Sequence, residues 1–353
     1  MESISSQLLR IIDANLNRIG EGLRFIEDVA RMLLDDAALT QQLKRMRHEV
    51  IRSDWPLYQQ LLQSRDSEGD VGVDIEVSGD EKYRELPTSI VANARRVQEG
   101  LRIMEELSKI PGISLDSEKF KHARFTLYTI EKTLLSRVMR RDKMNNLVGL
   151  YVVIDTQALQ GRSHVETASQ AVHGGAKIIQ LRDKVLSTKE LLPIAQQLKN
   201  LCAVHNVLFI VNDYLDLALA VDADGLHLGQ YDLPIGVARR LLPIDKIIGM
   251  SVRTLEQATA AQNEGADYIG VSSMYPTASK EDEEVVGLER LRQIKAAVRL
   301  PLVAIGGINK DNAADVIAAG ADSAAVISAV LGAEDVEEAS RQIAAKLGGE
   351  HID

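Results

Sequence analysis

The chain has 353 residues, of which 45% are hydrophobic and 26% are charged. This composition is typical of globular proteins and excludes a disordered chain. No apolar run approaches the ~20 residues of a membrane helix, and no basic segment followed by an apolar one opens the chain, so we expect neither a membrane span nor a secretory signal. The single cysteine, Cys202, excludes an internal disulfide. We therefore expect a cytoplasmic protein that, at about 100–200 residues per domain, has two domains.

The formal net charge of the chain is −10. This charge argues against nucleic acid as a main partner, because phosphate backbones select basic surfaces. Residues 1–146 hold 23 Lys and Arg against 24 Asp and Glu, whereas the remainder holds 18 against 27. The asymmetry indicates a domain boundary.

The first 140 residues have a helical pattern nearly throughout. One stripe of apolar residues recurs at spacings of three and four: Leu16, Ile19, Leu23, Ile26, Ala30 and Leu33. This spacing places them on one face of a helix. We therefore expect residues 1–143 to form an all-α domain.

An internal repeat runs through this region. Asn15, Arg18, Glu21, Arg24 and Glu27 recur 78 positions later as Asn93, Arg96, Glu99, Arg102 and Glu105, and Arg47 matches Arg124 with an offset of 77. The repeat predicts a duplicated helical hairpin that packs around a pseudo-two-fold axis. The polar stretch 64–87 between the copies is too long for a simple turn.

After a basic segment, 140–146, which we expect to be a linker, short β-branched runs alternate with helical patterns. The runs are 147–155, 177–184, 208–213, 225–229, 246–251, 268–274, 301–308 and 323–331. Helical patterns such as 254–264 and 335–347 follow them. Eight such units in residues 147–353 predict a (β/α)8 barrel of small size, with an open doubly wound sheet as the alternative.

The second strand of this barrel ends in alternating polar residues. Gln180, Arg182 and Lys184 share one face, because side chains alternate along a strand. Two cations and an amide at the carboxyl end of a barrel strand favour a phosphate or diphosphate site. The alternative is a solvated strand end with stray charges.

Two carboxylates follow the next two strands. Asp213 and Asp232 are expected at one rim, next to the anion site, where they would suit Mg²⁺ that also binds water and substrate oxygens. The alternative is that one caps a helix and the other forms a turn. His227 faces the barrel interior by alternation, where a lone buried histidine is more often structural than catalytic.

The remaining loops suggest a second phosphate site. Ser251 ends the fifth strand, and residues 275–280 have the hydroxyls, lysine and proline of a closing loop, although a surface turn explains them too. Gly306-Gly307 belong to the end of the seventh predicted strand and Ser328 to the eighth, and the loops after these two strands are where this barrel class habitually binds phosphate. Two anion sites at one mouth indicate two phosphorylated substrates, or one substrate with two phosphates.

The second half resembles the thiamine-phosphate synthase family. The resemblance rests on Gln-Leu-Arg-Asp-Lys at 180–184, Val-Asn-Asp at 211–213, Asp-Gly-Leu-His-Leu-Gly-Gln at 224–230, Tyr-Pro-Thr-Ala-Ser-Lys at 275–280 and Ala-Ile-Gly-Gly-Ile at 304–308. It implies a transferase that joins 4-amino-2-methyl-5-hydroxymethylpyrimidine diphosphate to a thiazole phosphate and releases diphosphate.

The resemblance also implies roles for individual residues. The pyrimidine diphosphate would be held by Gln180, Leu181, Arg182, Asp183, Lys184, Asn212, Ser251 and Lys280. The thiazole phosphate would be held by Thr277, Ala278, Ser279, Gly307, Ile327 and Ser328, and Mg²⁺ by Asp213 and Asp232. The implied mechanism is dissociative, with catalytic assistance from Arg182, Lys184, Lys280 and Ser251. Ser272-Ser273-Met274, Met250 and Arg253 depart from the family pattern.

The first 140 residues resemble the helical domain called ThiD-two. This resemblance implies a kinase that converts the pyrimidine monophosphate into the diphosphate, with ATP as a candidate donor. The repeated polar residues Asn15, Arg18, Glu21, Arg24, Asn93, Arg96, Glu99 and Arg102 are the candidates for its site, with residues 65–72 as a cover. The alternatives are surface Arg–Glu pairs and a dimerising or scaffolding helical domain.

Two other readings of the barrel stay open at this point. A thiazole tautomerase would need neither Mg²⁺ nor Asp213 and Asp232. A Schiff-base aldolase would use Lys184 or Lys280. The sequence does not decide the oligomeric state, for which a homo-oligomer is one option.

Overall fold

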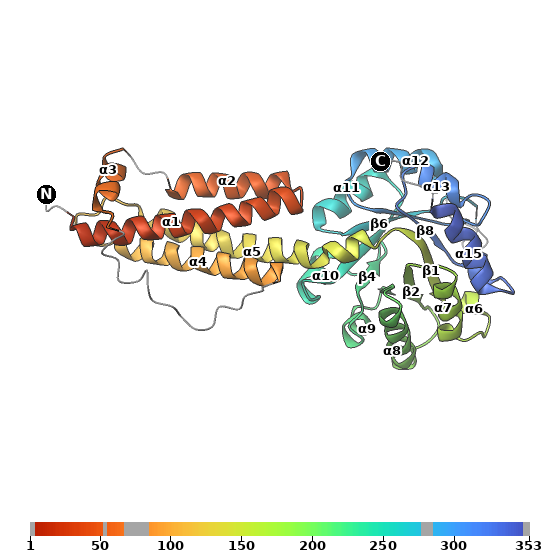
Figure 1. The fold of residues 1–353 in the computed structure, drawn as a ribbon. Helices are drawn as coiled ribbons and strands as arrows, with labels where there is room; N and C mark the ends of the chain where they lie inside the picture. The colour runs from red at the N-terminus through yellow and green to blue at the C-terminus, as the bar shows by residue number, and fades with distance from the viewer. Residues whose placement is uncertain (1–3, 52–54, 67–84, 277–284, 349–353) are drawn as a thin grey trace. The chain divides into compact units, whose positions relative to one another are not determined.

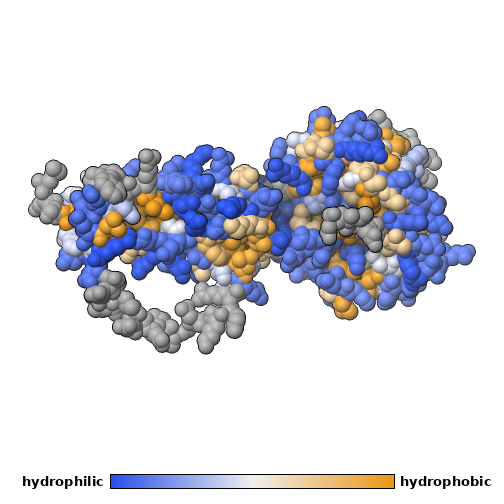
Figure 2. All heavy atoms as spheres, turned by 45° about the horizontal axis from the view of Figure 1, so that its top comes forward, coloured by the Kyte–Doolittle hydropathy of each residue, from blue (hydrophilic) through white to orange (hydrophobic). Residues whose placement is uncertain are grey.

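The computed structural model describes residues 4–51, 55–66, 85–276 and 285–348. The chain forms two compact units, residues 1–139 and 140–353, each with its own hydrophobic core (Figure 1). No helix among the described residues has both the length and the apolar character needed to cross a membrane. The face seen in Figure 2 is mostly hydrophilic on both units, with smaller hydrophobic patches between the charged residues.

The first unit is helical, as predicted. Its elements are α1 (Ser6–Asp28), the π-helical turn η1 (Val29–Leu33), α2 (Ala37–Ile51), α3 (Trp55–Ser64), α4 (Leu86–Leu107) and the greater part of α5 (Ser117–Asn145). Ser5 caps α1 by accepting a hydrogen bond from the backbone of Leu8 at 3.3 Å. The predicted apolar stripe packs in the core of this unit, although its last two residues, Ala30 and Leu33, lie on η1 and Leu33 is only partly buried.

Helices α1 and α4 carry the two copies of the repeat and cross at a pair of glycines. A Cβ atom on Gly22 would lie 2.5 Å from Cγ2 of Val97, and one on Gly100 would lie 2.8 Å from Cγ1 of Ile19. The offset of 78 residues relates Gly22 to Gly100 and Ile19 to Val97. The repeat therefore relates the first of these contacts to the second. The two helices therefore pack in antiparallel directions around the predicted pseudo-two-fold axis.

The predicted linker is the C-terminal end of a helix. Helix α5 continues to Asn145, so the interpretation of 140–146 as a linker was wrong. Within the second unit, Arg140 pairs with Asp267 at 2.9 Å and Lys143 pairs with Asp245 at 2.9 Å. These basic residues lie three positions apart on the helix and find acidic partners, which a solvated linker would not provide.

The second unit is a closed parallel barrel. Its strands among the described residues are β1 (Gly149–Asp155), β2 (Ile178–Arg182), β3 (Leu208–Asn212), β4 (Gly225–Leu228), β5 (Ile247–Val252), β6 (Tyr268–Ser272), β7 (Leu302–Ile305) and β8 (Ser323–Val326). Each strand pairs with the next along the chain, and β8 pairs with β1. This closure confirms the (β/α)8 barrel and excludes the open sheet.

The predicted eighth strand was too long. β8 ends at Val326, and Ser328–Leu331 form the short helix α14. Val330 and Leu331 are buried in the core, and a short buried apolar run does not by itself distinguish a strand from a helix.

Helices surround the barrel. They are α6 (Thr156–Leu159), α7 (His164–His173), α8 (Thr188–Val204), α9 (Leu215–Ala220), α10 (Ile235–Leu241), α11 (Leu255–Glu264), α12 (Gly287–Ala297), α13 (Ala313–Ala318), α14 and α15 (Val336–Leu347). Ser187 and Thr254 begin α8 and α11 with capping boxes. One apolar layer lies between strands and helices, and a smaller one fills the barrel interior.

Two large aromatic side chains close the lower part of the interior. Tyr151 and Tyr268 are fully buried, and a Cβ atom on Gly249 would lie 2.1 Å from Cζ of Tyr268. Glycine is required at this position because the ring occupies the space of a side chain. The polar residues of the next layer are thereby left facing the carboxyl ends of the strands.

Candidate active site

A cavity opens at the carboxyl ends of the strands, and all of the strands described above contribute to it. Its polar lining consists of Tyr151, Gln180, Arg182, Asn212, His227, Ser251, Ser272, Ser273 and Ser328. Its other lining residues are Val153, Gly270, Val303, Ile305, Gly306, Gly307, Ile308, Ala325, Val326 and Ile327. The sequence-predicted residues Gln180, Arg182, Asn212, Ser251, Gly307, Ile327 and Ser328 thus gather around one opening.

Two predicted residues of the second strand point elsewhere. Leu181 is buried in the apolar layer between strands and helices. Asp183 is also buried, and its carboxylate accepts backbone hydrogen bonds from Val185 at 2.7 Å and Leu186 at 2.5 Å. Neither lines the cavity, so the structure brings only alternate residues of this segment to the opening.

Arg182 is held by an aspartate that the sequence analysis missed. Its guanidinium forms an ion pair with Asp155, the last residue of β1. Asp155 also caps α6, because its carboxylate accepts hydrogen bonds from the backbone of Gln157 and Ala158 at 3.0 and 3.1 Å. Strand alternation from Tyr151 and Val153 was the signal that could have identified Asp155 as an inward-facing residue.

A lysine and two carboxylates meet beside the cavity. Lys184 forms an ion pair with Asp213, and Asp232 accepts a hydrogen bond from the backbone of Gly229 at 2.7 Å. Burial raises the pKa of Asp213, and interaction with the Asp232 carboxylate adds to this increase. Asp213 lies directly after β3 and has a positive φ of 61°, a backbone conformation that is uncommon for residues other than glycine.

This cluster fits a hard divalent cation. The ammonium group of Lys184 already occupies a cation position at Asp213, and the second carboxylate lies next to it. No group of three or more His, Cys, Asp or Glu in the described part of the chain could hold a metal ion by itself. A cation held here would therefore take its remaining ligands from water and substrate, as Mg²⁺ commonly does.

A chain of hydrogen bonds runs from the cavity into the barrel. Ser251 Oγ lies 2.8 Å from Nε2 of His227, whose Nδ1 lies 2.9 Å from the hydroxyl of Tyr268; that hydroxyl lies 3.2 Å from the hydroxyl of Tyr151. Burial lowers the pKa of His227 to about 4. The imidazole is therefore neutral near pH 7 and orients Ser251 through a hydrogen bond.

Paired glycines shape the opposite side of the cavity. Gly306 and Gly307 have positive φ angles of 107° and 66°. A Cβ atom on Gly306 would lie 2.2 Å from Oγ of Ser273, and one on Gly307 would lie 2.7 Å from the carbonyl oxygen of Pro276. The loop after β6 therefore packs directly on this backbone. The predicted residues Thr277, Ala278, Ser279 and Lys280 lie outside the described residues.

The helical unit has a second pocket, formed by α1 and α4. It is lined by Asn15, Arg18, Glu21, Arg96, Glu99, Gly100 and Ile103. Five of these residues were predicted from the repeat. Arg24, Asn93 and Arg102 are not part of its lining. Of the predicted cover, Arg65 pairs with Asp13 at 2.6 Å, and residues 67–72 lie outside the described part.

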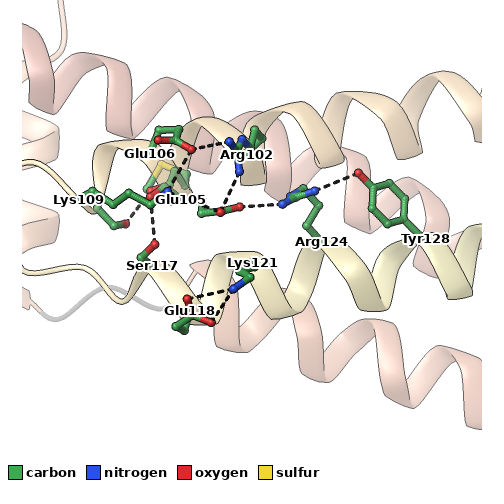
Figure 3. A network of polar contacts seen from close by, with 11 residues as sticks. Arg102, Glu105, Glu106, Lys109, Ser117, Glu118, Lys121, Arg124 and Tyr128 are labelled. Carbon is green, nitrogen blue, oxygen red and sulfur yellow. Dashed lines mark hydrogen bonds and ion pairs between the residues drawn. The ribbon is translucent and has the colours of Figure 1, made fainter.

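The other repeated charges serve the packing of this unit. Glu105 of α4 is buried between Arg102, at 2.9 Å, and Arg124 of α5, at 2.9 Å (Figure 3). Hydrogen bonding from Arg124 lowers the pKa of Glu105. The equivalent pair in the first copy joins Glu27 and Arg47 at 2.8 Å. The Glu27–Arg47 and Glu105–Arg124 pairs thus connect the two helices of each copy, and of these three pairs only Arg102–Glu105 has the i,i+3 spacing expected of surface pairs.

Both units match known families. Residues 150–330 match the family model described as thiamine monophosphate synthase, and residues 10–133 match the model described as the ThiD2 family. The thiamine-phosphate synthase of Nostoc punctiforme is 38% identical over 335 residues, which cover 94% of this chain and 92% of the relative.

Shorter relatives match as well. The thiamine-phosphate synthase of Methanospirillum hungatei is 53% identical over 197 residues, which cover 56% of this chain and 96% of the relative. A solved structure, the thiamine phosphate pyrophosphorylase from Pyrococcus furiosus, has 46% sequence identity and a TM-score of 0.54; the match covers 58% of this chain and 98% of that chain. Relatives of two different lengths therefore carry the same activity in their names.

Proposed function

The chain belongs to the thiamine-phosphate synthase family, and on this basis we propose how its residues carry out the reaction. The protein is a transferase of thiamine biosynthesis. It joins 4-amino-2-methyl-5-hydroxymethylpyrimidine diphosphate to 4-methyl-5-(2-phosphoethyl)thiazole, forming thiamine phosphate and diphosphate. The observation that carries the proposal is the gathering of Arg182, Asn212 and Ser251 at one opening.

The chemical demand of this reaction is stabilisation of a departing anion. The bond between the pyrimidine methylene carbon and the diphosphate oxygen breaks first, and its electron pair leaves with diphosphate. The thiazole nitrogen then forms the new bond to the methylene carbon of the pyrimidine cation. Arg182 and Lys184 stabilise the charge on the leaving group, and Lys280 is proposed as a third cation.

Asp213 and Asp232 are the residues that would hold Mg²⁺. When bound, the ion supplies further neutralisation of the diphosphate charge. Lys184, which pairs with Asp213 in this structure, would then be free to bind a phosphate oxygen. Asp213 thus forms the ion pair with Lys184 in this structure, and Asp213 and Asp232 together are the proposed ligands of the cation.

The remaining polar residues bind and orient the substrates. The carboxamides of Gln180 and Asn212 are hydrogen-bonded to each other at 3.2 Å, which keeps both directed at the cavity. Gly307, Ile327 and Ser328 are proposed to contact the thiazole phosphate. His227 holds Ser251 in position, and no general base is needed because the departing diphosphate generates the electrophile.

An Arg182→Ala variant tests this assignment. We expect diphosphate release to fall by at least about a hundredfold, because a charge stabiliser of the transition state is removed. Arg292→Ala is the matched control, since Arg292 lies on the exterior helix α12 and, among the described residues, forms an ion pair with Glu289 of the same helix. Unchanged turnover of Arg182→Ala would contradict the placement of the leaving group.

For the helical unit we propose the kinase reaction that supplies the barrel. A phosphate oxygen of the pyrimidine monophosphate attacks the terminal phosphorus of a nucleoside triphosphate such as ATP. A new P–O bond forms to the monophosphate, and the nucleoside diphosphate leaves with the electrons of the broken bond. The match to the ThiD2 family and the polar pocket on α1 and α4 support this assignment.

The test uses the intact chain carrying Arg182→Ala, so that the pyrimidine diphosphate accumulates. We expect formation of nucleoside diphosphate that depends on added pyrimidine monophosphate. No such formation, over a range of nucleoside triphosphates, would remove the kinase proposal and leave the helical unit as a dimerising or scaffolding module.

A further inference from the structure

The pocket on the helical unit joins equivalent residues from the two copies of the repeat. Arg18 and Glu21 come from α1, and their repeat equivalents Arg96 and Glu99 come from α4. Because α1 and α4 cross in antiparallel directions at Gly22 and Gly100, the two copies of this short motif approach the pocket from opposite sides. The duplication thus produces a single site near the pseudo-two-fold axis that uses both copies.

One polar atom in this pocket has no partner. Asn15 is only 3% exposed, and its amide nitrogen donates to the carbonyl of Ile11 at 2.8 Å. Its Oδ1 atom is buried without a hydrogen-bond partner. A buried acceptor without a donor is unfavourable. The atom therefore indicates a ligand that presents an N–H or O–H group to it.

The equivalent asparagine of the second copy is different. Asn93 donates to the carbonyl of Ser89 at 2.9 Å, and its Oδ1 atom accepts a hydrogen bond from Arg96 at 3.2 Å. The two equivalent asparagines therefore differ, because Oδ1 of Asn93 has a hydrogen-bond donor and Oδ1 of Asn15 has none. Asn15 lines the pocket, and Asn93 does not.

The arginines of the pocket are available to an anion. Arg47, Arg102 and Arg124 each form an ion pair with a glutamate. Within the described residues, by contrast, neither Arg18 nor Arg96 has a carboxylate partner. Guanidinium groups bind phosphate oxygens in a bidentate manner.

The two glutamates refine the chemistry of the expected ligand. Glu21 and Glu99 line the pocket together with Arg18 and Arg96, so the formal charges of its side chains sum to zero. We therefore expect the pocket to bind inorganic phosphate less well than a phosphorylated molecule that also carries hydrogen-bond donors.

We propose that this pocket is the acceptor-substrate site of the helical unit and binds a phosphorylated aminopyrimidine. The assignment rests on the proposed kinase function. Arg18 and Arg96 bind the phosphate group, and the Oδ1 atom of Asn15 accepts a hydrogen bond from the exocyclic amino group. The pyrimidine monophosphate has both features. ATP has them as well, so the acceptor site is distinguished from a donor site by the separate KM values of the two substrates.

The experiment measures phosphoryl transfer and binding with the intact chain. Arg18→Gln and Arg96→Gln should each raise the KM for the pyrimidine monophosphate at least tenfold, with a smaller change in the KM for the nucleoside triphosphate. Asn15→Ala should weaken binding of the aminopyrimidine monophosphate but not of an analogue in which hydrogen replaces the amino group. Arg95→Gln is the matched control, because Arg95 is exposed on the same helix and does not line the pocket.

The barrel unit provides an internal control for folding. Each variant is also assayed with pyrimidine diphosphate supplied directly, and the synthase rate should stay at the wild-type value because the substitutions lie in the other unit. An unchanged KM in both arginine variants would overturn the site while leaving the kinase function intact.

If the wild-type chain transfers no phosphate, the kinase function fails and calorimetry of pyrimidine monophosphate binding decides the site. Binding that is lost in the two arginine variants would support the pocket as a ligand site. Absent binding, or binding unaffected by the variants, would overturn it.

Discussion

Asp155 and Arg182 lie opposite each other in register on β1 and β2 and form an ion pair at the edge of the cavity. The second oxygen of the Asp155 carboxylate accepts hydrogen bonds from the first backbone amides of α6. The carboxylate is therefore fixed by a helix on one side, and it fixes the guanidinium on the other. Helix α6 and the proposed leaving-group site are coupled through a single side chain.

An Asp155→Asn substitution separates the two roles of this residue. Asparagine retains an acceptor oxygen for the α6 cap but loses the charge that orients Arg182. We expect kcat/KM of the synthase reaction to fall about tenfold or more, because small displacements of a catalytic group are costly. The measurement is steady-state kinetics of diphosphate release.

The matched control is Asp335→Asn. Asp335 caps α15 through the backbone amide of Glu338 at 2.9 Å and does not contact the cavity. It should lower stability slightly and leave kcat/KM unchanged. Equal kinetics for Asp155→Asn and the control would show that the ion pair does not orient Arg182 for the reaction.

Removal of divalent cations should abolish the synthase activity, and added Mg²⁺ should restore it. Asp232→Asn should raise the Mg²⁺ concentration needed for half-maximal activity by about 10–100-fold, as loss of groups around a metal typically does. Asp216→Asn is the control, because Asp216 is an exposed residue in the first turn of α9. Full activity in the presence of a chelator would contradict the proposed cation.

The half-buried imidazole of His227 makes the barrel sensitive to acid. Burial lowers the pKa of His227 to about 4 in the folded state, from about 6.5 in an unfolded chain. Its contribution to stability is therefore complete above pH 6.5 and is lost as the pH falls towards 4. The loss amounts to about 3 kcal/mol for this group.

The variant His227→Gln tests this linkage, since glutamine does not titrate. The free energy of unfolding of the barrel should fall by about 3 kcal/mol more in the wild type than in the variant between pH 7 and pH 4. Hydrogen exchange of β4 and β5 amides reports this difference for the barrel separately from the helical unit. Parallel pH profiles for the two proteins would contradict it.

Much of the barrel could be predicted because strand order and alternation are strict rules. They correctly brought Gln180 and Arg182 to the opening, whereas Asn212 was expected there from the family resemblance. The same rule applied to Asp155 would have found the partner of Arg182. The end of β8 could not be predicted, because the apolar run 328–331 is compatible with either a helix or a strand.

The helical unit shows a different limit of sequence reasoning. Asn15 and Asn93 occupy equivalent positions in the repeat, and the repeat does not indicate which of its arginines line a pocket. Tertiary packing decides that Arg102 pairs with Glu105 while Arg18 faces the pocket. Such symmetry breaking depends on side-chain contacts between helices, which spacing along one helix does not encode.

The glycine crossing of α1 and α4 provides a prediction about stability. A Cβ atom on Gly22 would lie 2.5 Å from Cγ2 of Val97 and 3.1 Å from the carbonyl oxygen of Asn93. We expect Gly22→Ala to force the helices apart and to destabilise the helical unit by about 1–3 kcal/mol, in spite of the higher helix propensity of alanine. Hydrogen exchange of the α1 and α4 amides reports unfolding of this unit.

Two further variants distinguish crowding from a general effect of alanine. Adding Val97→Ala removes the clashing methyl group, so the double variant should lose less than the sum of the two single losses. Gly236→Ala on α10, where a Cβ atom would meet nothing within 4 Å, should be neutral or stabilising for the barrel unit. Gly100→Ala should also destabilise, but less, since its Cβ atom would lie 2.8 Å from Cγ1 of Ile19 and 3.6 Å from the carbonyl oxygen of Asn15, which are longer distances than those at Gly22. Strictly additive losses for Gly22 and Val97 would show that the close crossing does not limit packing.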